Sequence, residues 1–141
     1  MRGNLGSWKR EIEVRSETLK KRILVVEDDA SVREMVKKML ERVGYDVIEA
    51  QNGSEAIERF QKAPTDLIIT DIIMPDKEGI ETIMELRRDF PDVKIIAISG
   101  GGRVGPDWYL TAARKLGAAK TFCKPFDRQE MLDAVHELVR S

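Results

Sequence analysis

The sequence has very little cysteine and no long hydrophobic run. A single cysteine among 141 residues, Cys123, excludes an internal disulfide and a cysteine-rich zinc site. The apolar runs are far shorter than the roughly 18 residues that a membrane-spanning helix needs, and no basic start leads into the apolar segment of a secretory signal. Ten glycines and five prolines are too few for a collagen-like or low-complexity chain. We therefore expect one globular domain of the reducing cytoplasm, with no part in a membrane.

Neither sign of charge dominates the whole chain. The formal net charge is −1, which gives no reason to expect direct nucleic-acid binding. The first 22 residues nevertheless contain seven Lys or Arg and three Asp or Glu, whereas the remainder contains 17 and 22. This basic start has few apolar positions and only a weak helical stripe. We expect residues 1–21 to be a basic extension, as a short helix or a flexible arm, and residues 22–141 to form the folded domain.

Five short apolar runs, rich in β-branched residues, alternate with amphipathic helical patterns. The runs predict strands at residues 23–26, 45–50, 67–71, 93–98 and 120–123. Asn52 and Asp127 are expected to cap two of the helices, and Gly44 is expected to end the first one. This alternation predicts right-handed βαβ units and a parallel sheet with helices on both faces.

Polar side chains occur where the predicted strands end. Glu27 and Asp28 follow the first strand, and Asp71 ends the third. Ser99 follows the fourth strand, and Lys124 follows the fifth. In a doubly wound parallel sheet the functional site lies outside the carboxyl ends of the strands. We therefore expect these five side chains to lie close together.

Three carboxylates at one sheet edge repel one another unless one takes up a proton or a cation binds. Carboxylate and carbonyl oxygens, completed by water, suit octahedral Mg²⁺. Beside such a cation an aspartate carboxylate can attack a phosphoryl group, while the Lys124 ammonium and the Ser99 hydroxyl bind the phosphoryl oxygens. The residues therefore predict Mg²⁺-dependent phosphoryl transfer onto Asp71.

Four motifs, in this order, resemble the receiver domain of the response regulators of two-component signalling. They are Glu27-Asp28 after Ile-Leu-Val-Val, Asp71-Ile-Ile-Met-Pro-Asp76 with Gly79, Ser99 after an apolar strand, and Lys124-Pro125-Phe126. The resemblance covers residues 22–141. It implies a flavodoxin-like, doubly wound α/β fold whose five parallel strands take the order 2-1-3-4-5.

The resemblance also implies the acceptor and the metal site. Asp71 is similar to the phospho-accepting aspartate of receivers. The Mg²⁺ ligands would be Glu27, Asp28, Asp71 and the backbone carbonyl of Ile73. Glu27 stands where an aspartate is commoner, which moves that carboxylate by one methylene, and we expect Mg²⁺ binding to survive this change.

Two further roles follow from the same resemblance. Ser99 would be the hydroxyl that turns toward the phosphoryl group, and Lys124 would pair with that group, with a cis peptide bond before Pro125. Many receivers carry an aromatic switch residue three positions before the lysine, where this chain has Thr121. We therefore expect no bulky switch there, because strand alternation turns the neighbouring Phe122 to the opposite face.

The implied partners are proteins. The phosphoryl donor would be a phosphohistidine on a sensor histidine kinase or a phosphotransfer protein. Phosphorylation would change a face built from the fourth helix, the fifth strand and the last helix, and that face would bind a downstream protein. Such a chain is not a conventional enzyme, because it catalyses its own phosphorylation and slow dephosphorylation. The charges on the last two helices do not decide whether it forms a homodimer.

Three alternatives stay open at this point. The chain could be a pseudo-receiver that acts as a constitutive interaction module. It could be a receiver excised from a hybrid kinase or a larger regulator. It could also be a Mg²⁺-dependent phosphatase with an aspartyl nucleophile, although such enzymes carry a second acid where this chain has Ile73.

Two residues that often carry chemistry are expected to be structural here. Cys123 is expected to be a small buried hydrophobic side chain. His136, which is the one histidine of the sequence, is expected at the margin of the core on the last helix. Neither is assigned a role in the site.

We predict slow loss of the phosphoryl group. In similar domains the residues two positions after the acceptor and two after the switch hydroxyl control the attack of water, and these are Ile73 and Gly101 here. Neither can orient a water molecule through its side chain. Decay of the phosphorylated protein, followed by intact mass after removal of the donor, should extend well beyond seconds; a half-life of seconds would contradict this.

Overall fold

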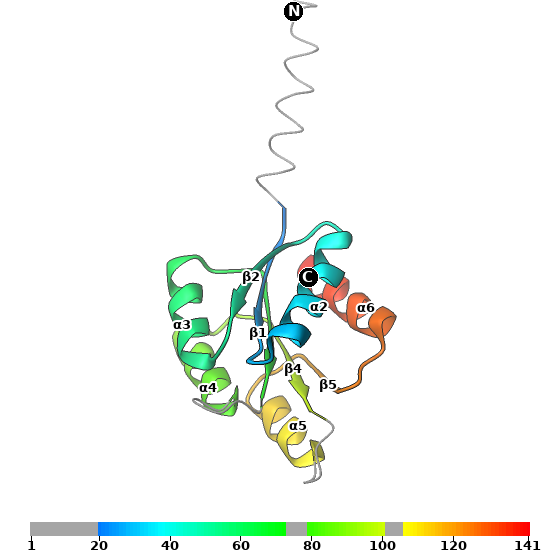
Figure 1. The fold of residues 1–141 in the computed structure, drawn as a ribbon. Helices are drawn as coiled ribbons and strands as arrows, with labels where there is room; N and C mark the ends of the chain where they lie inside the picture. The colour runs from blue at the N-terminus through cyan, green and yellow to red at the C-terminus, as the bar shows by residue number, and fades with distance from the viewer. Residues whose placement is uncertain (1–19, 73–78, 101–105) are drawn as a thin grey trace, which may run out of the picture.

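The computed structural model describes residues 20–72, 79–100 and 106–141, except for the side chains of residues 106–110. Its centre is a five-stranded parallel sheet in the order β2-β1-β3-β4-β5 (Figure 1). The strands are β1 (Arg22–Val26), β2 (Asp46–Ala50), β3 (Leu67–Asp71), β4 (Ile95–Ser99) and β5 (Lys120–Cys123). The predicted fold class and strand order are confirmed.

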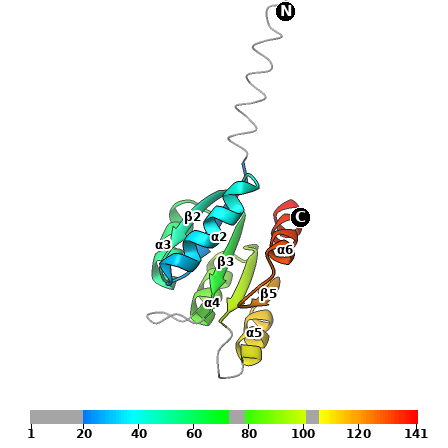
Figure 2. The ribbon, with the colours of Figure 1, turned by 45° about the vertical axis from the view of Figure 1, so that its right-hand side comes forward.

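The helices cover both faces of this sheet. They are α2 (Ala30–Arg42), α3 (Gly53–Lys62), α4 (Gly79–Asp89), α5 (Pro106–Lys115) and α6 (Arg128–Arg140). Buried residues of α2 and α6 pack on one face, and those of α3, α4 and α5 pack on the other (Figures 1 and 2). The βαβ connections thus place consecutive helices where the alternating pattern predicts them.

Alternation along the strands divides the core into two layers. In β1, Ile23 and Val25 belong to the cluster beneath α2 and α6, whereas Leu24 and Val26 belong to the cluster on the other face. This follows from the two-residue period of a strand, whose successive side chains point to opposite faces. A strand buried on both faces must be apolar at every position, which explains the continuous hydrophobic runs.

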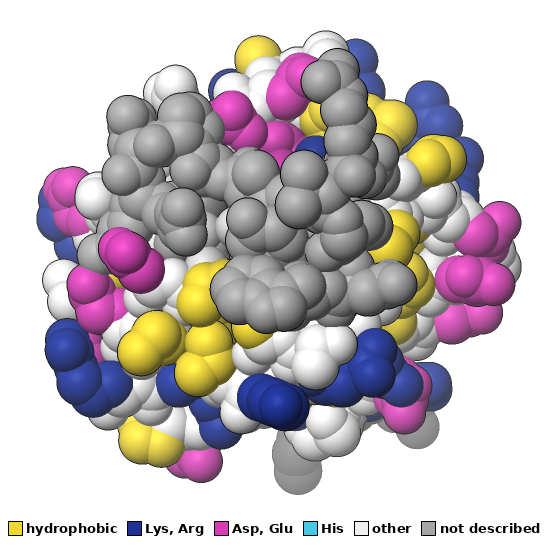
Figure 3. All heavy atoms as spheres, turned by 90° about the horizontal axis from the view of Figure 1, so that it is seen from below, with side chains coloured by type: hydrophobic (Ala, Val, Ile, Leu, Met, Phe, Trp, Pro, Cys, Tyr) yellow, Lys and Arg dark blue, Asp and Glu magenta, His cyan; other side chains and the backbone are white. Residues whose placement is uncertain are grey.

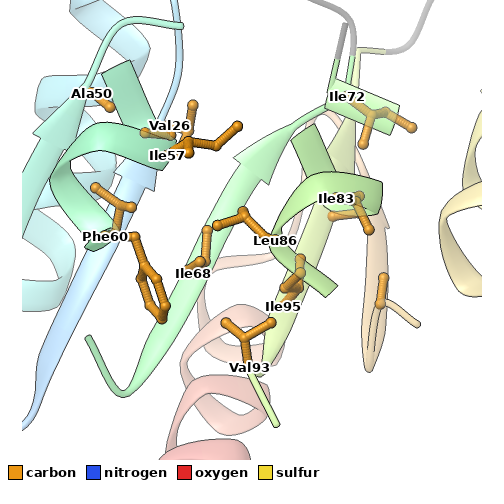
Figure 4. Packing of buried hydrophobic residues seen from close by; sticks show 14 of the residues in the cluster. Val26, Ala50, Ile57, Phe60, Ile68, Ile72, Ile83, Leu86, Val93 and Ile95 are labelled. Carbon is orange, nitrogen blue, oxygen red and sulfur yellow. The ribbon is translucent and has the colours of Figure 1, made fainter. Parts of the chain in front are cut away.

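The layer beneath α3 and α4 is filled by large aliphatic and aromatic side chains. Figure 4 shows Phe60 of α3 together with Ile83 and Leu86 of α4, which lie over the strand residues Ile68 and Ile95. Four of these five side chains are completely buried, and Phe60 is 4% exposed. Burial of each contributes about 1.5–3 kcal/mol to folding. The sheet is therefore a firm support for the loops at its edge.

The predicted helix ends are confirmed. The Asn52 side chain accepts a hydrogen bond from the Glu55 amide at 2.8 Å, and Asp127 accepts one from the Glu130 amide at 2.8 Å. Gly44, which follows α2, has a φ angle of +99°, a left-handed conformation that glycine adopts without strain. Local chemistry in the sequence therefore determines where these helices begin and end.

The burial of Cys123 differs from the sequence-based expectation. Cys123 is exposed rather than buried, because it ends the edge strand β5, which has a neighbouring strand on one side only. Met35, on the apolar stripe of α2, and Val43, which follows this helix, are 52% and 42% exposed. That stripe is wider than the contact with the sheet, which buries Val36, Met39 and Leu40.

Within residues 20–72, 79–100 and 106–141, no helix has the length and apolar character needed to cross a membrane.

Gly79 begins α4 in close contact with the strand end that carries Asp71. Its amide donates to the Ile72 carbonyl at 3.2 Å. A Cβ atom at Gly79 would lie 2.3 Å from the Ile72 Cα atom and 2.5 Å from the Asp71 carbonyl oxygen. Both are backbone atoms of a buried segment, so neither can move aside cheaply. Only a residue without a side chain fits here.

We predict that Gly79→Ala destabilises the protein by about 2–3 kcal/mol, because the added methyl group forces the backbone after β3 to shift. Urea unfolding followed by circular dichroism measures this change. Gly100→Ala is the matched control, since a Cβ atom there meets no atom of the described residues within 4 Å and the change should stay within about 0.5 kcal/mol. Equal stabilities of the two variants would contradict the close contact at Gly79.

Candidate functional site

The carboxyl ends of β1 and β3 bring three acidic side chains together. Glu27 and Asp28 follow β1, and Asp71 ends β3, the neighbouring strand. One carboxylate oxygen of each residue lies within 4.8 Å of the others. Glu27 and Asp71 are 4% and 6% exposed, whereas Asp28 is exposed. This donor set of hard oxygen atoms, open to solvent on the Asp28 side, is of the kind that binds a divalent cation such as Mg²⁺.

Lys124 lies between the two buried acids. Its ammonium group donates to an Asp71 carboxylate oxygen at 3.0 Å and also contacts a Glu27 carboxylate oxygen. The Lys124 side chain is 23% exposed. It therefore compensates two negative charges that would otherwise repel each other in a poorly solvated place.

Burial and neighbouring charges change the protonation of this group. Desolvation raises the pKa of Glu27 to about 7, and although the Lys124 hydrogen bond opposes this, the nearby Asp71 carboxylate adds to it. Desolvation also acts on Lys124, but its bonds to Glu27 and Asp71 outweigh that effect and raise the pKa of the ammonium above its ordinary value. Lys124 therefore stays charged at neutral pH, while Glu27 exchanges a proton near pH 7.

The loop that presents the acids is held by the start of α2. Asp29 caps this helix by accepting from the Ser31 amide at 2.9 Å and the Val32 amide at 3.2 Å. Its own amide donates to the second Glu27 carboxylate oxygen at 3.2 Å. Asp29 is therefore the N-cap of α2, and it is not one of the three acids whose oxygens lie within 4.8 Å of one another. A hydrogen bond from the Ser31 hydroxyl, together with those from the Val32 and Ser31 amides, holds the pKa of Asp29 below its usual range.

Ser99 and Lys124 occupy the ends of β4 and β5 at the same edge. The Ser99 side chain is completely buried, and its hydroxyl donates to the Gly100 carbonyl at 3.2 Å. The Lys124 amide donates to the Ser99 carbonyl at 2.8 Å, which links the two strand ends. The Lys124–Pro125 peptide bond is cis, as expected. Ile73, whose carbonyl is the remaining expected ligand, lies outside the described residues.

Thr121 and Phe122 point to opposite faces of β5, as strand alternation predicts. The Thr121 hydroxyl accepts from the Arg114 guanidinium of α5 at 2.9 Å. Phe122 packs against the core layer beneath α2 and α6. The expectation that Phe122 turns to the face opposite Thr121 is confirmed.

His136 is half-buried and contacts the Tyr45 hydroxyl through its Nδ1 atom. Tyr45 immediately precedes β2, so this contact lies at the sheet edge opposite the acids. The expectation that His136 sits at the margin of the core is confirmed.

Figure 3 looks onto the edge where the strands end, and acidic side chains gather near the top of that view.

Sequence reasoning missed one group of charged residues beside the acids. Arg33 of α2 reaches both the Glu27 carbonyl and the Glu49 carboxylate of β2. A positively charged side chain near the start of a helix interacts unfavourably with the helix dipole. The position of Arg33 was therefore the one feature of the sequence that could have indicated a special role. Its target is a backbone carbonyl, which no residue pattern reveals.

Comparisons with known proteins agree with this geometry. The family model described as the response regulator receiver domain matches residues 23–136. The response regulator receiver protein CpdR of Brucella abortus is 37% identical over 119 residues, covering 84% of this chain and 97% of that protein. The chemotaxis protein CheY of Thermotoga maritima is 35% identical over 119 residues, with the same shares covered. A receiver domain protein structure from Clostridium thermocellum has a TM-score of 0.79 at 26% identity, covering 85% of this chain and 94% of that one.

We predict a pH-dependent contribution of Glu27 to the stability of the metal-free protein. The Glu27 carboxyl has a pKa of 4.5 in the unfolded chain and of about 7 in the folded chain. Between these pH values only the folded state keeps the proton. Stability conferred by Glu27 should thus be complete below pH 4.5 and should fall as pH rises toward 7, by at most about 1.4 kcal/mol per pH unit.

The measurement is urea unfolding in a chelator, from pH 4.5 to 8, for the natural protein and Glu27→Gln. Groups with lowered pKa, such as Asp29, are present in both proteins and cancel in the difference. The natural protein should lose stability relative to the variant across the window. A difference that stays constant with pH would show that Glu27 titrates normally.

Proposed function

The chain belongs to the response regulator receiver domain family, and on this basis we propose that it accepts a phosphoryl group on Asp71 and thereby switches a protein-binding surface. The observation that carries this proposal is the Lys124 ammonium, which lies 3.0 Å from a buried Asp71 carboxylate oxygen inside a cluster of three acids. The Asp71 carboxylate, which would react, therefore lies beside both a site for a divalent cation and the Lys124 ammonium, which would bind the incoming phosphoryl group.

The acidic cluster fits Mg²⁺ as the resident cation. Glu27, Asp28 and Asp71 supply hard oxygen atoms within 4.8 Å of one another, and the Ile73 carbonyl is proposed as a further ligand. When bound, Mg²⁺ neutralises the carboxylates and the phosphoryl oxygens, so that like charges can approach. The exposed position of Asp28 leaves the cluster accessible from solvent.

The roles of the protein groups follow from their places. A carboxylate oxygen of Asp71 forms a bond to phosphorus as the bond from phosphorus to the donor nitrogen breaks. Lys124 is already paired with Asp71, so its ammonium can remain beside the product and bind a phosphoryl oxygen. Ser99 would exchange its hydrogen bond to the Gly100 carbonyl for one to the phosphoryl group.

We propose a protein as the donor, namely a sensor histidine kinase or a phosphotransfer protein. Receiver domains interact with histidine kinases. An apolar groove, formed by Val32, Met35, Pro125 and Phe126, adjoins Lys124. Met35 is 52% exposed at its rim. Such a surface beside the acceptor suits contact with a protein that brings a phosphohistidine to Asp71.

The output surface is proposed to be the face of α5, β5 and α6. Arg114 of α5 is hydrogen-bonded to Thr121 of β5, and Lys120 of β5 forms an ion pair of 3.5 Å with Glu137 of α6. These contacts link α5 and α6 to β5, the strand that directly precedes Lys124. Residues 1–21 are proposed to be an extension of the receiver unit of residues 22–141, in the cytoplasm.

We predict that acetyl phosphate adds one phosphoryl group in a reaction that requires both Mg²⁺ and Asp71. Intact-protein mass, with and without Mg²⁺, measures the adduct. Asp71→Asn should give none, because the amide is no nucleophile. Asp29→Asn is the matched control: it removes a nearby carboxylate outside the cluster, and asparagine caps a helix as well as aspartate does.

Each outcome separates the proposal from its alternatives. An adduct on the natural protein and Asp29→Asn, but not on Asp71→Asn, supports a phospho-accepting receiver. No adduct on a protein shown to be folded by circular dichroism supports a pseudo-receiver that binds its partner constitutively. An adduct of equal yield on Asp71→Asn would place the acceptor elsewhere.

A further inference from the structure

Arg33 connects the acidic loop to the neighbouring strand. Its Nη1 atom donates to the Glu27 backbone carbonyl at 2.8 Å, and its Nε atom donates to a Glu49 carboxylate oxygen at 3.3 Å. The Arg33 side chain is only 16% exposed. Arg33 is the fourth residue of α2, and helical side chains lean toward the start of their helix, which directs this one back over the loop.

This position is costly for a cation. The start of a helix favours negative charge, and α2 has no acidic residue in its first turn. Glu49 of β2 compensates the charge of Arg33 and also pairs with Lys37 at 3.4 Å. Arg33 therefore does not serve to stabilise α2. Its hydrogen bond to the Glu27 carbonyl accounts for a positive charge at this position.

The carbonyl in question belongs to the peptide unit that joins Glu27 to Asp28. The Glu27 amide donates to the Ala50 carbonyl at 3.1 Å, so both polar groups of the Glu27 backbone have partners on separate elements. Rotation of the peptide unit between the two acids would break the Arg33 hydrogen bond. The direction in which Glu27 and Asp28 present their carboxylates is thereby fixed.

We infer that Arg33 is a positioning residue for the divalent cation, which holds the peptide unit between Glu27 and Asp28 so that both carboxylates meet the ion without rearrangement. This inference rests on the proposed function, because it concerns Mg²⁺ at the same cluster. Arg33 is not itself proposed as a ligand of the ion or of the phosphoryl group. It acts through backbone geometry, as residues that orient metal ligands do.

Charge and geometry give opposite expectations for removing Arg33. A cation near the cluster repels Mg²⁺, so loss of its charge alone should strengthen binding slightly. Loss of the carbonyl contact should weaken binding, because the loop must then be ordered by the ion. The sign of the change therefore separates a positioning role from a merely electrostatic one.

The test is isothermal titration calorimetry of the metal-free protein with Mg²⁺ alone, without any phosphoryl donor. Arg33→Gln should raise the dissociation constant for Mg²⁺ about tenfold. Arg33→Lys keeps the charge but cannot bridge Glu27 and Glu49 with a planar fork, so it should also bind more weakly. Lys37→Gln is the matched control, since it removes one charge and a bond to the same Glu49 but touches nothing at the cluster.

A second readout separates binding from chemistry. With acetyl phosphate, Arg33→Gln should need about tenfold more Mg²⁺ for half-maximal phosphorylation, while its maximal rate at saturating Mg²⁺ stays within about twofold of the natural protein. Thermal unfolding in a chelator verifies that each variant is folded. If Arg33→Gln is not folded, the comparison is made with Arg33→Lys alone.

The outcomes differ for the two levels of the argument. Mg²⁺ binding by the natural protein and Lys37→Gln, with weaker binding by both Arg33 variants, supports the inference. Binding by the Arg33 variants as tight as, or tighter than, that of Lys37→Gln overturns it and leaves the proposed function intact. A natural protein that binds no Mg²⁺ overturns the magnesium part of the proposed function together with the inference.

Discussion

The Lys124 ammonium lies between the carboxylates of Glu27 and Asp71, which are 97 and 53 residues away in the sequence. Two acids buried at one sheet edge are stable together only with such compensation. The contact requires β1, β3 and β5 to end at the same edge of the sheet. Regular pairing provides this alignment, with Val26 beside Thr70 and Ser99 beside Cys123. The whole sheet therefore acts as the scaffold of one ionic contact.

The apolar layers keep that alignment rigid. Because β1, β3 and β4 are covered on both faces, a shift of any strand would disturb two packed layers at once. The polar residues of the site lie at the carboxyl ends of these buried runs. Glu27 directly follows the fully buried run of β1, and Ser99 is the last residue of the fully buried β4. Stability and chemistry thus occupy different parts of the same strands.

Most of the fold could be predicted from the sequence, because its signals are local: β-branched runs, helical spacing, and caps at Asn52 and Asp127. The assembly of Glu27, Asp28 and Asp71 was also predictable, since parallel strands end at a common edge. Burial at the rim was not, as exposed Cys123 shows, because it depends on which strand lies at the edge of the sheet. Nor was the Arg33 contact, because its acceptor is a backbone carbonyl.

The strands begin at the opposite edge, and the connections there leave the helices and enter the next strand. They include the turn at Gly44 and the one at Gly117, both with positive φ. None of them carries a member of the acidic cluster. Insertions or deletions in these turns would leave the register of the strands unchanged. Over evolution, this edge can therefore vary in length and composition, while the edge that carries the acids is held to a fixed geometry.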